Sequence, residues 1–317
     1  MARTPQPELA VSNSPAGRSD AGRSTAANLL VSMRPGEWTK NLFVFAGLLF
    51  GQRLTDSAAV VRSVGAFAIF CALASVVYLV NDVMDREQDR QHPRKRLRPI
   101  ASGALQSSTA ILTAIVLAIG ALGAAWWMAP SFGAVATGYV TLLVLYSGPL
   151  KHIVIIDVLA IAIGFVMRAV AGAVVLDVVI SHWLLVCTIL LALFIALAKR
   201  RHELMLLADE ATSHRPILGE YSAYLLDQMI AVVTASTLIA YIFYTISPET
   251  EQKFGTSWLG LTIPFPLYGI FRYLYLVHRR EGGGSPADLL LNDRPLLACV
   301  TLWVVAVVLI IYHPFVP

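Results

Sequence analysis

Long apolar segments recur along almost the whole chain, and they constrain its fold more than any other feature. Of the 317 residues, 57% are hydrophobic and 14% are charged, whereas an average soluble domain has roughly 25% charged residues. A soluble chain of this length has no interior large enough for so much apolar surface, but a bilayer accepts it. The pattern predicts an all-α integral membrane protein with about nine transmembrane helices, at residues 38–52, 61–81, 108–128, 132–148, 153–176, 182–198, 228–247, 257–277 and 295–313.

Lys and Arg are distributed unequally between the two sides that these spans define. If the segments after the second, fourth, sixth and eighth spans face the cytoplasm, that side carries 15 of these cations and the other side carries 3, namely Arg53, Arg62 and Lys253. Cytoplasmic loops carry an excess of Lys and Arg. The asymmetry predicts a multi-pass protein of the cell membrane with a cytoplasmic N-terminus and an external C-terminus, and it supports an odd number of spans.

The segment before the first span differs in composition from the rest. Residues 1–27 are rich in Ser, Ala, Pro, Gly and Arg and lack a long apolar run, which predicts a disordered cytoplasmic tail and not a secretory signal. Residues 28–317 are expected to form one transmembrane catalytic domain. The three cysteines, Cys71, Cys187 and Cys299, lie in apolar stretches without paired spacing, so we expect small buried side chains and no disulfide or metal site.

The most informative polar segment directly follows the second apolar run. If the helix continues, Asn81, Asp85 and Asp89 lie on one face over two turns, and we call this trio the acidic ladder. Such oxygen ligands suit Mg²⁺, which commonly bridges to substrate phosphates. A bound cation would also relieve the repulsion between neighbouring carboxylates. The alternative is an ordinary solvated helix end.

Charged residues flank the ladder on both sides. Asp82, Arg86 and Arg90 form a parallel stripe at the same spacing, which for Asp82 favours simple salt bridging. A basic run follows the ladder, and within it Arg94 and Arg98 are candidates for binding an anionic substrate. The alternative for this run is contact with anionic lipid at the cytoplasmic surface.

Other polar residues fall near the cytoplasmic ends of further spans. Lys40 is expected within membrane depth, where it would bind phosphate unless its side chain reaches to the surface. Tyr146 and Lys151 flank the Gly148-Pro149 pair, which ends the fourth span. A phenol and an ammonium group at this position are suited to bind phosphate. The equally favoured alternative is an aromatic residue at the membrane interface and a lysine that only helps to set the orientation in the membrane.

The ladder and the residues after it carry a family resemblance. Asn81-x-x-x-Asp85-x-x-x-Asp89, followed by Arg94 and by Arg98-Pro99-Ile100-Ala101-Ser102-Gly103, resembles the UbiA prenyltransferase superfamily, and the resemblance extends over essentially residues 30–315. It implies a UbiA-like bundle of nine transmembrane helices. It also implies that a Mg²⁺–diphosphate substrate binds in a cavity open to the cytoplasm and to lipid, with Asn81, Asp85 and Asp89 as metal ligands and Asp85 and Asp89 as catalytic residues.

Three further segments, at 34–41, 146–152 and 199–204, resemble the decaprenyl-phosphate phosphoribosyltransferases within that superfamily. Typical members of the superfamily carry a second acidic ladder after the sixth span. Here that place is Lys199-Arg200-Arg201-His202-Glu203, so basic residues replace most of the acidic ones. The exchange suits substrates richer in phosphate and disfavours prenylation of an aromatic ring. The alternative for this segment is a basic cluster that flanks the membrane.

The resemblance implies transfer of 5-phosphoribose from 5-phosphoribosyl 1-diphosphate to polyprenyl (decaprenyl) phosphate, with Mg²⁺ as cofactor, for cell-wall arabinan precursors. It implies that Asp157, in the fifth span, binds ribose hydroxyls or orients a base, whereas Arg168 is expected to be a structural partner. The substrate-binding residues that it implies are Lys40, Asn41, Arg94, Arg98, Tyr146, Lys151, Lys199, Arg201 and Glu203.

Three other functions compete with phosphoribosyl transfer. The nearest is prenyl transfer from a prenyl diphosphate to an aromatic acceptor. A transporter is disfavoured because the acidic residues cluster at one membrane face, whereas transport sites usually lie near the midplane. A structural membrane protein would not explain an Asn-Asp-Asp ladder at four-residue spacing. A homo-oligomer is compatible with the sequence, and nothing in it indicates a nucleic-acid partner.

Overall fold

The computed structural model describes residues 23–92, 95–207, 216–279, 289–290 and 292–312, and the regular structure in these ranges is entirely helical. Short 3₁₀ helices, labelled η, alternate with α-helices. In chain order the elements are α1 (Thr25–Met33), η2 (Pro35–Phe45), α2 (Ala46–Phe50), α3 (Ser57–Met84), α4 (Arg86–Gln91), η3 (Lys95–Leu97), α5 (Pro99–Ser102), α6 (Ser107–Met128), α7 (Pro130–Ser147), η4 (Leu150–His152), α8 (Ile156–Val174), α9 (His182–Leu207), η6 (Pro216–Glu220), α11 (Ala223–Ile246), α12 (Pro248–Phe254), η7 (Trp258–Thr262), α13 (Pro264–Arg279) and α15 (Arg294–Tyr312).

Seven helices in the described ranges are long and apolar enough to cross a bilayer, in agreement with the all-α membrane fold that the sequence predicts. They are α3, α6, α7, α8, α9, α11 and α15, and they coincide with the second to seventh and the ninth predicted spans. The first and eighth predicted spans are helical but divided, since η2 leads into α2 and η7 precedes α13. The count of nine transmembrane helices therefore stays a prediction.

Local sequence sets several helix boundaries. Asp56 caps α3, because its carboxylate accepts hydrogen bonds from the backbone N–H groups of Ala58 and Ala59. Pro130 lies in the first turn of α7, where a backbone donor is not needed. Helix α9 continues past the predicted end at residue 198 to Leu207, because Lys, Arg and Glu are good helix formers. The basic segment after the sixth span thus lies on the helix itself.

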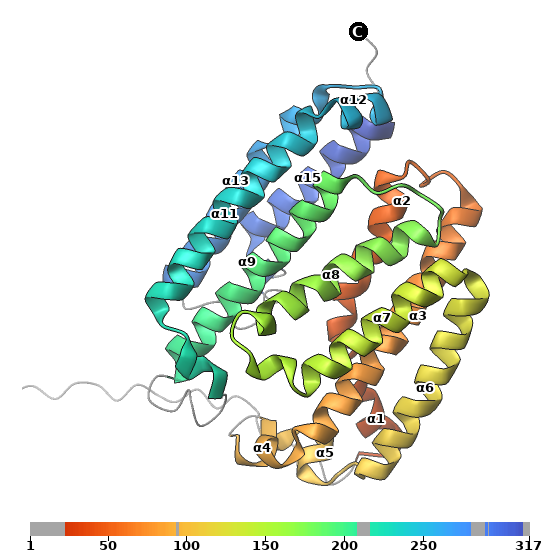
Figure 1. The fold of residues 1–317 in the computed structure, drawn as a ribbon, viewed down its shortest axis with the longest axis vertical. Helices are drawn as coiled ribbons and strands as arrows, with labels where there is room; N and C mark the ends of the chain where they lie inside the picture. The colour runs from red at the N-terminus through yellow and green to blue at the C-terminus, as the bar shows by residue number, and fades with distance from the viewer. Residues whose placement is uncertain (1–22, 93–94, 208–215, 280–288, 291, 313–317) are drawn as a thin grey trace, which may run out of the picture.

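The helices form one bundle with α8 at its centre (Figure 1). Helices α3, α6 and α7 lie on one side and α9, α11, α13 and α15 on the other, while α8 contacts both α7 and α9. Helices α1, α4 and α5 and the connection between α7 and α8 gather at one end of the bundle, and α2 and α12 lie at the opposite end. The acidic ladder belongs to the first of these ends, which is the end that the charge distribution predicts to be cytoplasmic.

Two glycines allow η2 and α2 to pack closely against α8. A Cβ atom added at Gly172 would lie 1.7 Å from the carbonyl oxygen of Val44, and one added at Gly47 would lie 2.4 Å from the carbonyl oxygen of Gly172. Small residues are enriched at membrane helix interfaces because they let two backbones approach. This crossing holds η2, which carries Lys40, against the central helix.

The surface and the cysteines agree with a membrane protein. Large apolar side chains such as Val61, Ile119 and Val232 are exposed on the outside of spanning helices, where lipid would cover them. The three cysteines are buried and free, as predicted. Helix α1 begins at Thr25, so the end of the segment predicted as a tail is helical. Residues 1–22 lie outside the described ranges, and the division into tail and catalytic domain stays a prediction.

Candidate active site

The acidic ladder lies where α3 ends and α4 begins. Helix α3 stops at Met84, and Asp85 adopts φ −90° and ψ 4° before α4 starts at Arg86. Many active-site residues occupy this sparsely populated backbone region. The helical hydrogen bonds nevertheless continue, from the Asp85 N–H to the Asn81 carbonyl at 2.9 Å and from the Asp89 N–H to the Asp85 carbonyl at 2.8 Å. The three ladder residues therefore remain one turn apart, although the helix predicted to carry them is interrupted.

Asp85 contacts both a ladder partner and a cation from another element. The Asn81 Nδ2 donates to Asp85 Oδ2 at 3.1 Å, and the Lys151 Nζ donates to Asp85 Oδ1 at 2.5 Å. Lys151 reaches this position from η4, because α7 ends at Ser147, before the Gly148-Pro149 pair, as the sequence predicts. Lys151 therefore lies at the ladder, although it follows Asp85 by 66 positions in the sequence.

Asp82 also belongs to this cluster. It forms salt bridges, as the sequence favours, but it is buried and its partners in them are not Arg86 and Arg90. Its side chain is only 2% exposed and pairs with Arg34 and with Arg98, whose Nη1 lies 3.2 Å from Asp82 Oδ1. The same Arg98 nitrogen lies 2.6 Å from Asp89 Oδ2, so one guanidinium joins two carboxylates. Positions 82 and 89 are two turns apart on one face, which is the spacing that brings both within reach of Arg98.

The remaining members of the predicted stripe lie elsewhere. Arg90 pairs with Glu87 at 3.0 Å and donates its Nε to the carbonyl oxygen of Ala101. Arg90 therefore joins α4 to α5, and Asp82 pairs with residues outside α3 and α4. Arg98, which the sequence predicts as a substrate ligand, stands at the ladder, whereas Arg94 lies outside the described residues.

A second cluster forms around Arg200 of α9. Its Nε donates to Asp157 Oδ2 at 2.9 Å, its Nη1 to Glu203 Oε2 at 2.6 Å and its Nη2 to the Tyr146 hydroxyl at 3.3 Å. The Tyr221 hydroxyl donates to the other Asp157 oxygen at 2.7 Å. We call these five residues the Arg200 cluster. It unites three residues that the sequence predicts in the site, Tyr146, Asp157 and Glu203, around an arginine that the prediction omitted.

The position of Asp157 changes its expected role. Its side chain is fully buried, and each carboxylate oxygen already accepts a hydrogen bond, from Arg200 or from Tyr221. A carboxylate held in this way is better suited to orient Arg200 than to bind ribose or remove a proton. Tyr221 lies between η6 and α11, outside the spanning helices. Burial, and after it the hydrogen bond to Asp157, raise the pKa of Tyr221 to about 12, so the hydroxyl remains a donor at neutral pH.

Two predicted substrate ligands face other partners. Asn41 is fully buried, and its Oδ1 accepts from the Arg168 Nε at 2.8 Å while its Nδ2 lies 3.4 Å from the Cys71 sulfur. Arg168 also donates to the Tyr139 hydroxyl at 2.7 Å, in agreement with its expected structural role. Arg201 pairs at 2.5 Å with Asp227 of α11. Neither Asn41 nor Arg201 contacts the ladder or the Arg200 cluster in these interactions.

Lys40 of η2 and Lys199 of α9 both lie within electrostatic range of Glu37. Lys40 forms an ion pair with Glu37 one turn away in η2. Lys199 of α9 and Arg34 at the start of η2 also lie within electrostatic range of the Glu37 carboxylate. Because Arg34 also pairs with Asp82, this group is continuous with the ladder. Cations from η2, α9, η4 and the segment before α5 therefore converge at one end of the bundle.

The donor chemistry of the ladder fits a hard divalent cation. Asp85 and Asp89 offer carboxylate oxygens, Asn81 offers an amide oxygen, and such ligands suit Mg²⁺, which also keeps waters or substrate phosphates. Within the described residues, no group of three His, Cys, Asp or Glu side chains is arranged to hold a metal. An ion here would therefore need the Asn81 oxygen, and Lys151 and Arg98 would have to yield the carboxylates that they now hold.

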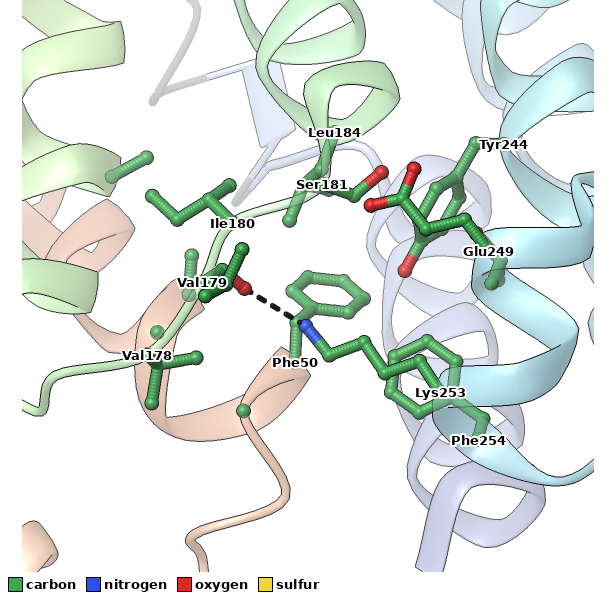
Figure 2. Close-up of a pocket in the computed structure, with 15 residues that line it drawn as sticks. Phe50, Val178, Val179, Ile180, Ser181, Leu184, Tyr244, Glu249, Lys253 and Phe254 are labelled. Carbon is green, nitrogen blue, oxygen red and sulfur yellow. Dashed lines mark hydrogen bonds between the residues drawn. The ribbon is translucent and has the colours of Figure 1, made fainter.

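A small cavity at the opposite end of the bundle is no candidate for the substrate site (Figure 2). It lies between α2, α12 and the segment between α8 and α9, and Lys253 crosses it to donate to the Val179 carbonyl at 3.0 Å. Its volume of about 20 Å³ is enough for roughly one water molecule. Arg98 and Lys151, which suit a phosphorylated substrate, lie at the ladder.

Residues 41–292 match the sequence profile of the UbiA prenyltransferase family. The chain belongs to the UbiA prenyltransferase family. Its relatives include a decaprenyl-phosphate phosphoribosyltransferase of Mycolicibacterium smegmatis, 32% identical over 295 residues that cover 89% of this chain and 92% of that protein. A protein of the same name from Mycobacterium tuberculosis is 33% identical over 288 residues, which cover 89% of this chain and 93% of that one.

Solved structures of the UbiA family share the fold. A UbiA homolog from Archaeoglobus fulgidus bound to GPP and Mg²⁺ aligns with a TM-score of 0.71 at 19% identity, covering 89% of this chain and 99% of that one. The homolog bound to Cd²⁺ aligns with a TM-score of 0.67 at 17% identity, covering 90% and 99%. These identities are low, so the likeness establishes the UbiA bundle and leaves the substrates to be argued from the site.

Proposed function

We propose that this UbiA family protein transfers 5-phosphoribose from 5-phosphoribosyl 1-diphosphate to a polyprenyl phosphate such as decaprenyl phosphate. The observation that carries the proposal is the convergence of cations from separate elements at the ladder end. Arg34, Lys40, Arg98, Lys151 and Lys199 all lie beside carboxylates there. The two substrates together bring a diphosphate and two monophosphates, and their charge matches this set better than one prenyl diphosphate with an uncharged aromatic ring does.

In this proposal, the cations that pair with the ladder bind the diphosphate of the donor. Lys151 and Arg98 hold Asp85 and Asp89 at 2.5 and 2.6 Å. If Asn81, Asp85 and Asp89 were to hold Mg²⁺, both cations would be free to bind phosphate oxygens with charge-assisted hydrogen bonds. Mg²⁺ bound there would supply neutralisation of the leaving diphosphate. The ion pairs of the structure thus keep ligands and cations in position before the substrate arrives.

In this proposal, the end of α9 binds the acceptor phosphate. Lys199 lies in electrostatic range of Lys40 and Glu37, and Arg200 is fixed by Asp157 and Glu203. The bilayer around the bundle would accommodate the prenyl tail. Relatives named decaprenyl-phosphate phosphoribosyltransferase support this choice of acceptor. The role in cell-wall arabinan precursor synthesis is part of the proposal and follows from the family resemblance of the sequence.

The proposed reaction exchanges one bond at the anomeric carbon for another. The bond from this carbon to the diphosphate oxygen breaks, and the diphosphate leaves with the electron pair. A phosphate oxygen of the lipid forms the new bond from the opposite face, which inverts the configuration. The lipid phosphate is already anionic, so no strong general base is required. Positioning and electrostatic stabilisation by Lys40, Arg98 and Lys151 supply the catalysis.

A paired-donor assay tests this proposal against prenyl transfer. Purified protein in detergent with lipid is given labelled phosphoribosyl diphosphate plus polyprenyl phosphate, or a prenyl diphosphate plus an aromatic acid. We expect a labelled phosphoribosyl lipid in the first reaction only. Formation of a prenylated aromatic product alone would reject the proposal in favour of the prenyl transfer that the solved neighbours, bound to GPP or DMAPP, make the second candidate.

A further inference from the structure

The backbone at Ile155 adopts a conformation that its side chain disfavours. Its φ is 69° and its ψ is −42°, in a region that β-branched residues rarely enter. Such strain persists only where surrounding contacts enforce it. In the described part of the chain, only Arg34, Gln52 and Asp177 share a positive φ among residues other than glycine, and none of them is β-branched.

One hydroxyl group holds this strained residue. The Ile155 N–H donates to the Tyr221 Oη at 2.8 Å, and the Tyr221 hydroxyl donates its own proton to Asp157 at 2.7 Å. Tyr221 is 66 residues from Ile155 along the chain and is buried. Because both the donor and the acceptor capacity of the hydroxyl are used, Tyr221 fixes Ile155 relative to the Arg200 cluster.

Ile155 in turn controls the path of the segment that carries Lys151. This segment runs from the end of α7 at Ser147 to the start of α8 at Ile156, and only three residues lie between Lys151 and Ile155. The Lys151 Nζ lies 2.5 Å from Asp85 in the ladder. A change in φ at Ile155 would redirect the chain between these two points and withdraw the ammonium group from Asp85.

We propose that Tyr221 is a positioning residue that holds the strained Ile155 and so keeps Lys151 at the ladder, where it binds the donor diphosphate. The inference rests on the proposed function for the role of Lys151. Tyr221 itself touches no reacting atom. It directly follows η6, so it also ties η6 to the conformation of the site.

The first test is Tyr221→Phe, which removes one oxygen atom, with Tyr224→Phe as its matched control. Tyr224 lies three residues away, at the start of α11, and its side chain is exposed. We expect Tyr221→Phe to raise the KM for phosphoribosyl diphosphate about 10-fold, the lower end of the effect of losing a supporting hydrogen bond. The KM for polyprenyl phosphate should change less than 3-fold, and Tyr224→Phe should match the unmodified protein.

Two combined variants separate positioning from general damage. In a Lys151→Ala background, Tyr221→Phe should cause no further rise in the KM for the donor, because the group that it positions is gone. Ile155→Gly should restore at least half of the lost donor affinity in the Tyr221→Phe protein, since glycine adopts a positive φ without strain. A purely structural role would predict additive losses in the first case and no rescue in the second.

Three results would overturn the positioning role of Tyr221. They are additive effects of Tyr221→Phe and Lys151→Ala, absence of rescue by Ile155→Gly, and failure of Tyr221→Phe alone to accumulate in the membrane. If the unmodified protein makes no phosphoribosyl lipid, the proposed function fails first. If it does, and Lys151→Ala weakens donor binding while Tyr221→Phe has no effect, only the present inference fails.

Discussion

Arg200 and Asp157 form an ion pair in which neither side chain is more than 2% exposed, with 2.9 Å between the guanidinium Nε and the carboxylate Oδ2. The pair joins α9 to α8 at the ladder end of the bundle. Two charges buried this deeply are stable together, whereas either one alone would be a desolvated charge without its partner. The pair therefore fixes the relative position of the two central helices and of the residues around them.

The first prediction concerns this pair. Arg200→Leu should lower the stability of the protein by roughly 3–5 kcal/mol, because Asp157 would keep only the Tyr221 hydroxyl. The measurement is the thermal unfolding midpoint of the purified protein in detergent. Arg201→Leu is the matched control, since its partner Asp227 is partly solvated and such pairs contribute about 1 kcal/mol or less. Equal shifts of the unfolding midpoint for both variants would show that the buried pair contributes no more to stability than the partly solvated pair does.

The second prediction concerns the ladder carboxylates. Asp85→Asn should reduce kcat/KM for phosphoribosyl transfer at least about 100-fold, since the amide lacks the negative charge of the carboxylate that it replaces and binds a divalent cation more weakly. The unfolding midpoint should change little, because Lys151 is partly exposed and can turn to solvent. Glu87→Gln, a change at an exposed carboxylate in α4, should leave the rate within 2-fold of the unmodified protein. Near-normal turnover by folded Asp85→Asn would rule out the ladder as the metal site.

The third prediction concerns divalent cations. Dialysis against EDTA should abolish phosphoribosyl transfer, and Mg²⁺ should restore it, because Asp85, Asp89 and the donor diphosphate together need a counter-charge. Binding of the labelled donor, measured separately, should weaken in parallel. The unfolding midpoint serves as a control for damage by the chelator. Full turnover with all divalent cations removed would contradict a metal-assisted departure of diphosphate.

The fourth prediction concerns the crossing of η2 and α8. Gly172→Ala should strongly reduce the yield of folded protein, because the new Cβ atom would lie 1.7 Å from the Val44 carbonyl oxygen. Overpacking costs about 1–3 kcal/mol in cores that can adjust, and here the obstructing atom belongs to the backbone. Gly120→Ala in α6 is the control, since a Cβ there meets nothing within 4 Å. Comparable yields of the two variants after membrane extraction would argue against this packing.

The fifth prediction concerns orientation in the membrane. The three natural cysteines are buried, so a single cysteine added at an exposed position should dominate labelling by a membrane-impermeant maleimide. Glu87→Cys should react only after the cytoplasmic face is opened, whereas Arg53→Cys should react in intact cells. The charge distribution favours this orientation. The reverse pattern would place the ladder outside the cell and would exclude a cytoplasmic phosphoribosyl donor.

The positions of the helices were largely predictable because hydrophobic length is a local property. An apolar run of about 20 residues spans a bilayer whatever its neighbours are, and seven runs correspond to such helices. The division of the first and eighth runs into shorter elements was not predictable in this way. It depends on tertiary packing such as the approach of Gly172 to Val44, which no local pattern records.

The sequence by itself determined the membrane fold, the family and the ladder, because each rests on spacing within one segment. Only the tertiary structure decided which charges meet. In that structure, Asp82 is buried and pairs with Arg34 and Arg98, and Lys151 pairs with Asp85. Arg200 points inward and pairs with Asp157, whereas Arg201 pairs with Asp227. Neighbouring helix residues such as Arg200 and Arg201 differ by about 100° in direction. Their partners therefore follow from which helices pack together, and a sequence read one segment at a time does not contain that information.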